Sequence, residues 1–248
     1  MSFAEDIKLA AALAEAAGRI ALAVRASGLV EGRGLGDAGD KAANAFLMPA
    51  LRQHRPDDGL LSEESEDSAE RLSHDRGWII DPVDGTREFA EGRGDWAVHV
   101  GLSINGEAQV GAVALPDLGL VLSSDASETR AAEATGKMVV SRSRAPALAE
   151  DVAQKVGLEL VGMGSAGAKA MAVVRGEADA YLHSGGQYEW DNCAPVAVAQ
   201  AHGLHCSRID GSALRYNRAE ALSPDLLICR RELAEPLLGA IASAQATA

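Results

Sequence analysis

The segment WIIDPVDGTREF, residues 78–89, constrains this chain most, because an apolar run leads directly into two aspartates, a proline and a glycine. The apolar residues predict a buried strand, and Asp, Pro and Gly are poor strand formers, so we expect the strand to end at Asp81. Asp81 and Asp84 are separated by a turn, which allows both carboxylates to face one point. Such oxygen ligands, joined by the Val83 carbonyl, suit Mg²⁺. A plain Asp-Pro turn with a helix cap is the alternative interpretation.

The residues that follow add a phosphate site to this interpretation. Gly85 and Thr86 open the predicted helix TREFAEG, whose first backbone N–H groups have no partner inside the helix and can hold a phosphate oxygen. Metal-binding carboxylates beside such a helix start predict metal-assisted phosphoryl chemistry.

Two further acidic segments can join this site. LSEESED, residues 61–67, follows a short predicted strand, so Glu63 or Glu64 reaches the same edge as Asp81 if the two strands are neighbours. A solvated acidic loop is the usual structure of such a run. Asp191, in EWDNCAP, lies at a predicted helix start, where capping is its alternative role.

Other motifs carry less chemistry. Ser165 in GMGSAGAKA precedes a predicted helix and looks like an anion cradle, but the segment is not a GxxxxGK[ST] loop, which excludes a nucleotide triphosphatase of that class. His99 is predicted to be a packed or exposed strand residue rather than a catalyst. No Cys-His signature accompanies Cys193, and the sequence has no GxSxG elbow.

The first half of the chain is predicted to combine two helices with a meander of strands. The first helix runs to about Ala26, and a glycine-rich loop over residues 28–40 leads to a second helix that Asp40 can cap. From Trp96 onward, apolar residues alternate with small or polar ones, and Asn105-Gly106 predicts a hairpin between antiparallel strands.

A change of composition at residues 132–137 divides this half from a second one, in which strands and helices alternate. We therefore predict an N-terminal α+β lobe, residues 1–136, that carries most metal ligands. A C-terminal α/β lobe, residues 137–248, is expected to contribute the last metal ligand and substrate-binding residues. The cleft between the lobes is the expected ligand site.

The charge of the chain narrows the class of partner. A formal net charge of −13 opposes binding to a nucleic-acid polymer or an anionic membrane, and it fits a protein that gathers carboxylates around divalent cations. The three cysteines form no CxxC pair, and charges interrupt the N-terminal segment where a signal peptide needs an apolar run. We expect a cytoplasmic protein with reduced thiols.

Taken together and in this order, LSEES, WIIDPVDGTREF, GSAGAKAMAVVRGEADAY and EWDNCAP resemble the inositol monophosphatase superfamily of metal-dependent, lithium-sensitive phosphatases. The resemblance extends over about residues 6–230. It implies a mixed α/β (α+β) fold, a layered αβαβα sandwich of two lobes. It also implies two or three Mg²⁺ ions in the active site, held by Glu63, Asp81, the Val83 carbonyl, Asp84 and Asp191.

The same resemblance assigns the remaining roles. Asp40, Glu63 and Thr86 form the implied catalytic group, in which Thr86 holds the attacking water with help from Asp40. The chain lacks the threonine usual before Asp40, which is a departure from the family pattern. The implied substrate-binding residues are Gly85, Thr86, Ser165, Lys169 and Arg144.

Finer features resemble the 3'(2'),5'-bisphosphate nucleotidase branch of this superfamily. These are Glu88-Phe89, the YEWD context, Lys169, VVSRSR and DGSALRY at residues 210–216. Lys169 suits a second phosphate, with Arg142, Arg208 and Arg215 as looser candidates. The branch removes the 3'-phosphate of adenosine 3',5'-bisphosphate, a by-product of sulfate assimilation, and its 5'-phosphosulfate analogue is a further candidate substrate.

Alternatives remain open at this point. Within the same class they are inositol 1-phosphate and fructose 1,6-bisphosphate hydrolysis. A different class is an inactive regulatory protein that binds metal and nucleotide. The expected partner is in each case a small phosphorylated metabolite, and a homodimer is left open.

Overall fold

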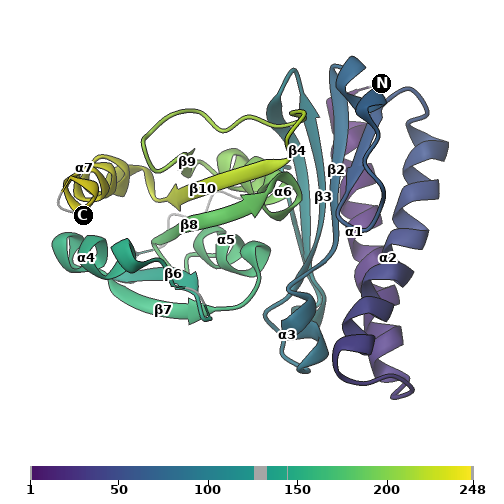
Figure 1. The fold of residues 1–248 in the computed structure, drawn as a ribbon, viewed down its shortest axis with the longest axis horizontal. Coiled ribbons are helices and arrows are strands. Elements are labelled where there is room, and N and C mark those ends of the chain that lie inside the picture. Colours follow the sequence, from purple (N-terminus) through teal and green to yellow (C-terminus); the bar gives the residue numbers. More distant parts are fainter. Residues whose placement is uncertain (1, 126–132, 144, 247–248) are drawn as a thin grey trace.

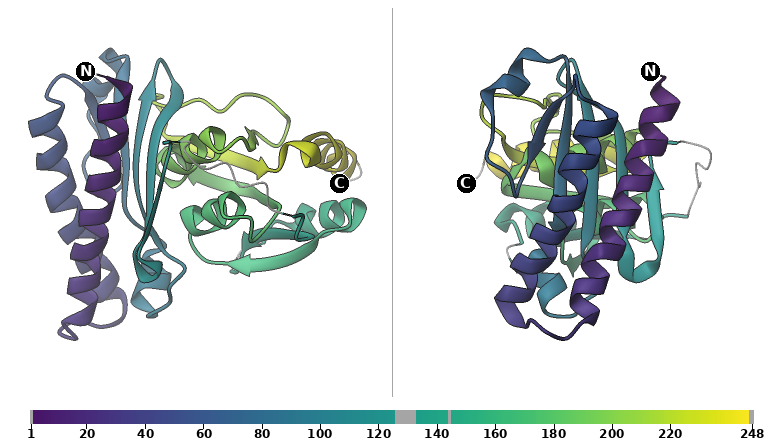
Figure 2. Two further views of the ribbon diagram at one scale, coloured as in Figure 1. Left: turned by 180° about the vertical axis from the view of Figure 1, so that it is seen from behind. Right: turned by 90° about the vertical axis from the view of Figure 1, so that its right-hand side faces the viewer.

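The computed structural model describes residues 2–125, 133–143 and 145–246. Two five-stranded sheets and three pairs of helices form five layers (Figure 1, Figure 2). The layered αβαβα sandwich predicted from the sequence is confirmed.

The two long N-terminal helices cover one face of the first sheet. The elements of this half are α1 (Phe3–Ala26), α2 (Gly32–His54), β1 (Gly59–Ser62), the 3₁₀-helix η1 (Ala69–Ser73), β2 (Arg76–Asp84), α3 (Thr86–Ala90), β3 (Ala97–Ile104), β4 (Glu107–Leu115), the 3₁₀-helix η2 (Pro116–Leu118) and β5 (Leu120–Ser123). The strand order is β1-β2-β3-β4-β5, with β1 parallel to β2 and the later neighbours antiparallel. The predicted meander is therefore present. Asn105 and Gly106 have φ of 52° and 78°, the left-handed backbone that a two-residue hairpin turn requires.

The second sheet is mixed. Its half of the chain contains β6 (Lys137–Ser141), α4 (Ala147–Val156), β7 (Glu159–Met163), α5 (Ala166–Val174), β8 (Ala180–Tyr188), α6 (Glu189–Ala201), β9 (His205–Ser207), β10 (Leu222–Cys229), the 3₁₀-helix η3 (Arg231–Leu233) and α7 (Ala234–Gln245). The strand order is β7-β6-β8-β10-β9. Parallel pairs join β6 to β7 and β8, and antiparallel pairs join β10 to β8 and β9.

Three apolar cores hold the layers together. One lies between α1, α2 and the first sheet, where Leu47 and Trp78 are fully buried. The second fills the space between the two sheets around α5 and α6, which pack there (Figure 1). The third lies under α4 and α7. Because the middle core takes residues from both halves, α5 and α6 are held directly against the first sheet.

The glycine-rich loop predicted over residues 28–40 is wrong, because α2 begins at Gly32 and Asp40 lies inside the helix. The glycines allow close packing against α3. A Cβ built on Gly36 would lie 2.6 Å from Cγ2 of Thr86, and one on Gly39 would lie 2.6 Å from Cε1 of Phe89. Tertiary contact thus outweighs the low helix propensity of glycine.

Two predicted boundaries also differ. Strand β2 continues through Asp81 to Asp84, with a register shift against β3 between these residues that accommodates the proline. Helix α6 begins at Glu189, so Asp191 is in its first turn instead of at the cap. In the part of the chain that the structure describes, no helix is both long and apolar enough to cross a membrane.

Candidate metal and phosphate site

Three aspartates from both halves of the chain meet between the sheets. Asp81 and Asp84 lie at the end of β2, and Asp191 lies in the first turn of α6. One carboxylate oxygen of each lies within 4.8 Å of the others. Asp81 and Asp84 are buried and Asp191 is half-buried. Such a group of hard oxygen donors is suited to a divalent cation.

Asp84 is held from several sides. Its Oδ1 accepts a hydrogen bond of 3.1 Å from the Ala166 N–H, and its Oδ2 accepts one of 2.6 Å from the Gly167 N–H. Both donors belong to the first turn of α5. Burial pushes the pKa of Asp84 upward, but His99 and the N–H of Gly167 outweigh it and lower the pKa below its usual value. Asp84 is therefore held in its charged form.

His99, on β3, links Asp84 to the segment before Asp191. The ring is fully buried, its Nδ1 lies 2.9 Å from the carbonyl oxygen of Trp190, and its Nε2 lies 3.1 Å from Oδ2 of Asp84. A carbonyl and a charged carboxylate can only accept, so these surroundings favour the ring form with a proton on each nitrogen. Burial alone would lower the pKa of His99, and the Asp84 charge reverses this and raises it.

The sequence predicts that His99 is a packed or exposed strand residue rather than a catalyst. The structure shows the first of these two alternatives, because the side chain is buried. The contact with Asp84 was not predicted. The strand pattern contained a signal for this contact. His99 lies on the same face of β3 as Ala97 and Gly101, and Val98 and Val100 lie on the opposite face. Small residues on one face of a strand indicate close packing, here against α6.

Of the triad formed by Asp81, Asp84 and Asp191, Asp81 is the member that has a buried oxygen, Oδ1, without a hydrogen-bond partner among the described residues. Burial raises the pKa of Asp81 well above its usual value, and the nearby charges of Glu63, Asp84 and Asp191 add to this. For Asp191, burial and the charge of Asp84 raise the pKa to about 6. A buried oxygen without a donor among like charges fits a bound cation, since such charges need an opposite partner.

Glu63 arrives from β1, as expected for a neighbouring strand. The parallel pairing of β1 with β2 places it one residue beyond the Ser62–Ile80 pair, and its N–H donates to the Ile80 carbonyl at 3.2 Å. The residue is exposed as a whole. Its carboxyl nevertheless loses solvent near the cluster, and this loss and the charges of Asp191 and Asp84 raise its pKa to about 7.

Thr86 connects Asp40 to the end of β2. Its hydroxyl lies 2.9 Å from Oδ2 of Asp40 and 3.1 Å from the carbonyl oxygen of Val83. Asp40 is buried, its Oδ1 has no partner among the described residues, and burial raises its pKa to about 8. The Thr86 hydroxyl has one proton and two possible acceptors. Rotation of the hydroxyl can therefore direct this proton to Asp40 or to the Val83 carbonyl without rearrangement of the backbone.

The predicted substrate-binding residues lie in different surroundings. Ser165 caps α5, and its hydroxyl accepts a hydrogen bond of 2.9 Å from the Ala168 N–H. Lys169 is buried, donates to the carbonyls of Gly164 and Ser165, the latter at 2.8 Å, and lies 5.2 Å from the ring centre of Tyr181. Burial lowers the pKa of Lys169 to about 8. Its ammonium is therefore occupied by backbone carbonyls in this conformation.

The arginines named for a second phosphate are engaged in ion pairs. Arg208 pairs with Asp225 at 2.6 Å, and Arg215 pairs with Glu107 at 2.8 Å. Arg144 lies outside the described residues.

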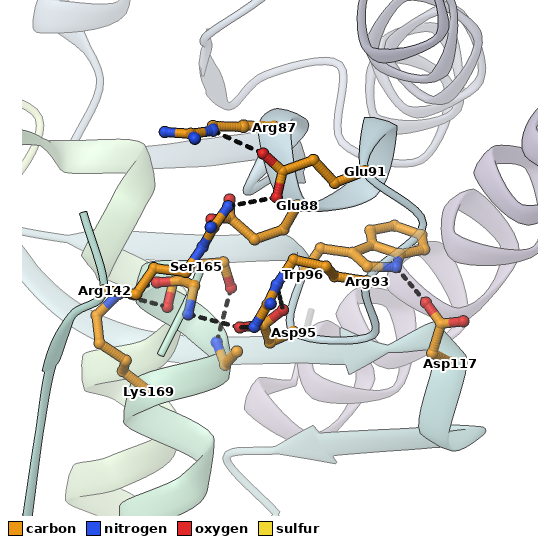
Figure 3. A network of polar contacts seen from close by, with 12 residues as sticks. Arg87, Glu88, Glu91, Arg93, Asp95, Trp96, Asp117, Arg142, Ser165 and Lys169 are labelled. Atoms are coloured by element: carbon orange, nitrogen blue, oxygen red, sulfur yellow. Dashed lines mark hydrogen bonds and ion pairs between the residues drawn. The ribbon is translucent and has the colours of Figure 1, made fainter. Parts of the chain in front are cut away.

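Arg142 belongs to a network that ties α3 to the second half of the chain (Figure 3). Its guanidinium reaches Oε1 of Glu88 at 2.6 Å and Oε2 of Glu91 at 2.7 Å. Close by, Asp95 accepts a hydrogen bond of 2.7 Å from the N–H of Gly164. These contacts hold α3 and the residues that follow it against the end of β6 and the turn that precedes α5.

Comparisons with known proteins identify the family of this chain. A model of the inositol monophosphatase family matches residues 4–246. The chain is 50% identical over 240 residues to the 3'-phosphoadenosine 5'-phosphate phosphatase of Mycobacterium tuberculosis (strain CDC 1551 / Oshkosh), covering 92% of this chain and 90% of the relative. It is 30% identical over 197 residues to the 3'(2'),5'-bisphosphate nucleotidase CysQ of Escherichia coli (strain K12), covering 74% and 80%.

A solved structure extends the comparison to the fold. CysQ from Bacteroides thetaiotaomicron, described as a bacterial member of the inositol monophosphatase family, superposes with a TM-score of 0.79. The two are 22% identical, and the match covers 92% of this chain and 97% of the other. At this identity the likeness concerns the fold alone.

Proposed function

The chain belongs to the inositol monophosphatase family, and on this premise we propose that it removes the 3'-phosphate from adenosine 3',5'-bisphosphate in a Mg²⁺-dependent reaction. The observation that carries this proposal is the group formed by Asp81, Asp84 and Asp191, found in a chain half identical to a relative with that substrate in its name. The 5'-phosphosulfate analogue of this nucleotide is a further proposed substrate.

We propose Asp81, Asp84, Asp191, Glu63 and the Val83 carbonyl as the metal ligands. The orphaned Oδ1 of Asp81 and the raised pKa of three of these carboxyls support this assignment, because each indicates negative charge without a partner. Two or three bound Mg²⁺ ions would lower the pKa of a bound water and neutralise the phosphate. Oxygen-only donors favour Mg²⁺ over softer transition metals.

The proposed roles of the remaining residues concern the water and the phosphate. The Thr86 hydroxyl would orient the attacking water, and the ionised form of Asp40 would accept the proton that Thr86 passes on, in agreement with their 2.9 Å contact. The N–H groups of Gly85 and Thr86 would donate to phosphate oxygens. Glu63 belongs to this catalytic group as well as to the ligands. No protein nucleophile is required.

The second half of the chain would supply the substrate side of the site. We propose Ser165, Lys169 and Arg144 as substrate-binding residues, and the division into residues 1–136 and 137–248 as the division between the two roles. A second-phosphate contact of Lys169 requires its ammonium to leave the carbonyls of Gly164 and Ser165.

We also propose a cytoplasmic location. Cys193, Cys206 and Cys229 are all free thiols, which is the state that a reducing compartment maintains.

A phosphate-release assay tests the proposed function. The rate would be measured on adenosine 3',5'-bisphosphate, inositol 1-phosphate and fructose 1,6-bisphosphate, each with Mg²⁺ and with a chelator. We expect the highest kcat/KM on adenosine 3',5'-bisphosphate in the presence of Mg²⁺. We expect no phosphate release from any of the three substrates in the presence of the chelator. A higher kcat/KM on either of the other substrates would contradict the assignment, and absence of turnover on all three would favour a regulatory binding protein.

A further inference from the structure

An exposed tyrosine lies directly before the helix that carries Asp191. Of the three tyrosines, Tyr181 and Tyr216 are buried, while Tyr188 is 49% exposed. Tyr188 is the last residue of β8 and the cap residue of α6. Its N–H donates to Oδ2 of Asp191 at 2.6 Å, so its backbone is in direct contact with one member of the triad.

The Tyr188 ring is held in place by Trp190. The two rings are stacked, with their centres 4.6 Å apart and their planes inclined by 8°. Trp190 is half-buried and packs against the core between the two sheets, and its carbonyl is the group that His99 contacts. The stack therefore rests on the same rigid segment that carries Asp191. One face of the Tyr188 ring is covered by Trp190, and nearly half of the residue remains accessible to solvent.

Neither packing in the core nor capping of α6 accounts for an exposed aromatic ring at position 188. The capping interaction uses the backbone N–H of Tyr188, which any residue except proline supplies. Water contact with half of a large aromatic residue has no benefit for folding, because burial of apolar surface is the favourable process. A ring that is already stacked on one side loses little freedom when a second planar group stacks on the other side.

We propose that Tyr188, backed by Trp190, is the stacking platform for the nucleobase of the substrate. This inference rests on the proposed function, since it supplies the part of the nucleotide that the metal site does not hold. The phosphate would lie at the triad, the base would lie on the free face of the Tyr188 ring, and the ribose would connect them. Stacking uses the π-face that every base has, so it selects nucleotides over inositol and sugar phosphates and does not distinguish adenine from guanine.

Two ligands that differ only in the presence of the nucleobase test this contact. Binding of AMP and of ribose 5-phosphate, which lacks the base, would be measured by titration calorimetry with Mg²⁺ for the wild type, Tyr188→Ala and Tyr188→Phe. We expect Tyr188→Ala to weaken AMP binding by about tenfold, to leave ribose 5-phosphate binding unchanged, and Tyr188→Phe to bind AMP like the wild type. In turnover, Tyr188→Ala should raise KM for adenosine 3',5'-bisphosphate by a similar factor and change kcat less.

Leu222→Ala serves as the control for the loss of exposed apolar surface. Leu222 is the strand partner of Tyr188 and is 37% exposed, but it has no ring. We expect this variant to bind AMP like the wild type. An equal loss of AMP binding in Leu222→Ala and Tyr188→Ala would overturn the proposal, as would equal effects of Tyr188→Ala on AMP and ribose 5-phosphate.

Two further outcomes separate this inference from its premise. If the wild type releases no phosphate from adenosine 3',5'-bisphosphate, the proposed function fails, and the calorimetric comparison still decides whether Tyr188 stacks on a base. If Tyr188→Ala lowers the molar mass in light scattering and leaves AMP binding unchanged, the ring is a contact between two copies of the chain, and the proposal is wrong.

Discussion

Nε2 of His99 lies 3.1 Å from Oδ2 of Asp84, and the other nitrogen of the same ring contacts the carbonyl of the residue before Asp191. One buried side chain therefore connects two proposed metal ligands that come from different halves of the chain. Gly167 leaves room for it, because a Cβ at that position would lie 2.1 Å from the same Nε2. His99, Asp84 and the start of α5 form one packed unit.

We expect His99→Asn to weaken Mg²⁺ binding by about tenfold, because residues that orient metal ligands contribute 10–100-fold to metal affinity. Asparagine cannot donate to Asp84 and to Trp190 at the same time across this distance. The Mg²⁺ concentration for half-maximal activity and calorimetric Mg²⁺ titration measure the effect. Ser103→Ala, a buried substitution on the same strand, is the matched control. Unchanged Mg²⁺ affinity in His99→Asn would show that the contact does not position Asp84.

Asp84→Asn is expected to abolish turnover while the protein remains folded. Asparagine keeps the size of the side chain and one acceptor for the N–H groups of α5, but it removes the charge that a divalent cation needs. Activity, Mg²⁺ titration and the thermal midpoint Tm should be compared with those of Glu66→Gln, which removes an exposed charge from the acidic loop. Turnover like that of the wild type in Asp84→Asn would reject the metal assignment.

The stability of the metal-free protein should fall as the pH rises from about 5 to about 8. The pKa values of Asp40, Glu63 and Asp191 are raised to about 8, about 7 and about 6 by burial. Their unfolded values lie near 4, so the folded protein holds more protons over this range and loses stability as they dissociate. Saturating Mg²⁺ should flatten the slope by pairing the charges. Tm measured in chelator and in Mg²⁺ across this range checks the sign, and a Tm that rises with pH in chelator would contradict it.

Gly36→Ala is expected to lower kcat with little change in fold. The added Cβ would lie 2.6 Å from Cγ2 of Thr86, so the hydroxyl that contacts Asp40 must shift. A displacement near 1 Å at a reacting group can cost about 100-fold in rate. In Gly34→Ala, on the same helix, the nearest contact is the flexible Val30 side chain at 3.2 Å, which makes it the control. Equal kcat in both variants would show that the close approach of α2 to Thr86 does not position the hydroxyl.

Lys169→Ala should lower the free energy of unfolding by about 1–3 kcal/mol, because two buried carbonyls lose their donor. Lys169→Met keeps the apolar stem and separates the loss of charge from the loss of packing. Denaturant titration measures the change. The proposed second-phosphate contact predicts in addition that KM rises more for adenosine 3',5'-bisphosphate than for inositol 1-phosphate. Equal rises for both substrates would argue against that contact.

Local features of the sequence predicted much of the fold. The alternation after Trp96, the Asn105-Gly106 turn and the helix to Ala26 all appear in the structure close to where they were expected. Period and turn chemistry depend on neighbouring residues, so a single sequence contains them. The acidic motifs predicted which side chains could meet, and the β1–β2 pairing brought Glu63 to the expected edge.

The sequence by itself thus predicted most of the strands, the hairpin and the acidic residues that are proposed here as metal ligands. Only the tertiary structure decided that residues 32–40 are helical, that His99 contacts Asp84, that Lys169 is buried and that Tyr188 lies exposed on Trp190. These features depend on contacts between residues far apart in the chain. The energies of such contacts exceed local conformational preferences, and the pattern of neighbouring residues does not reveal them.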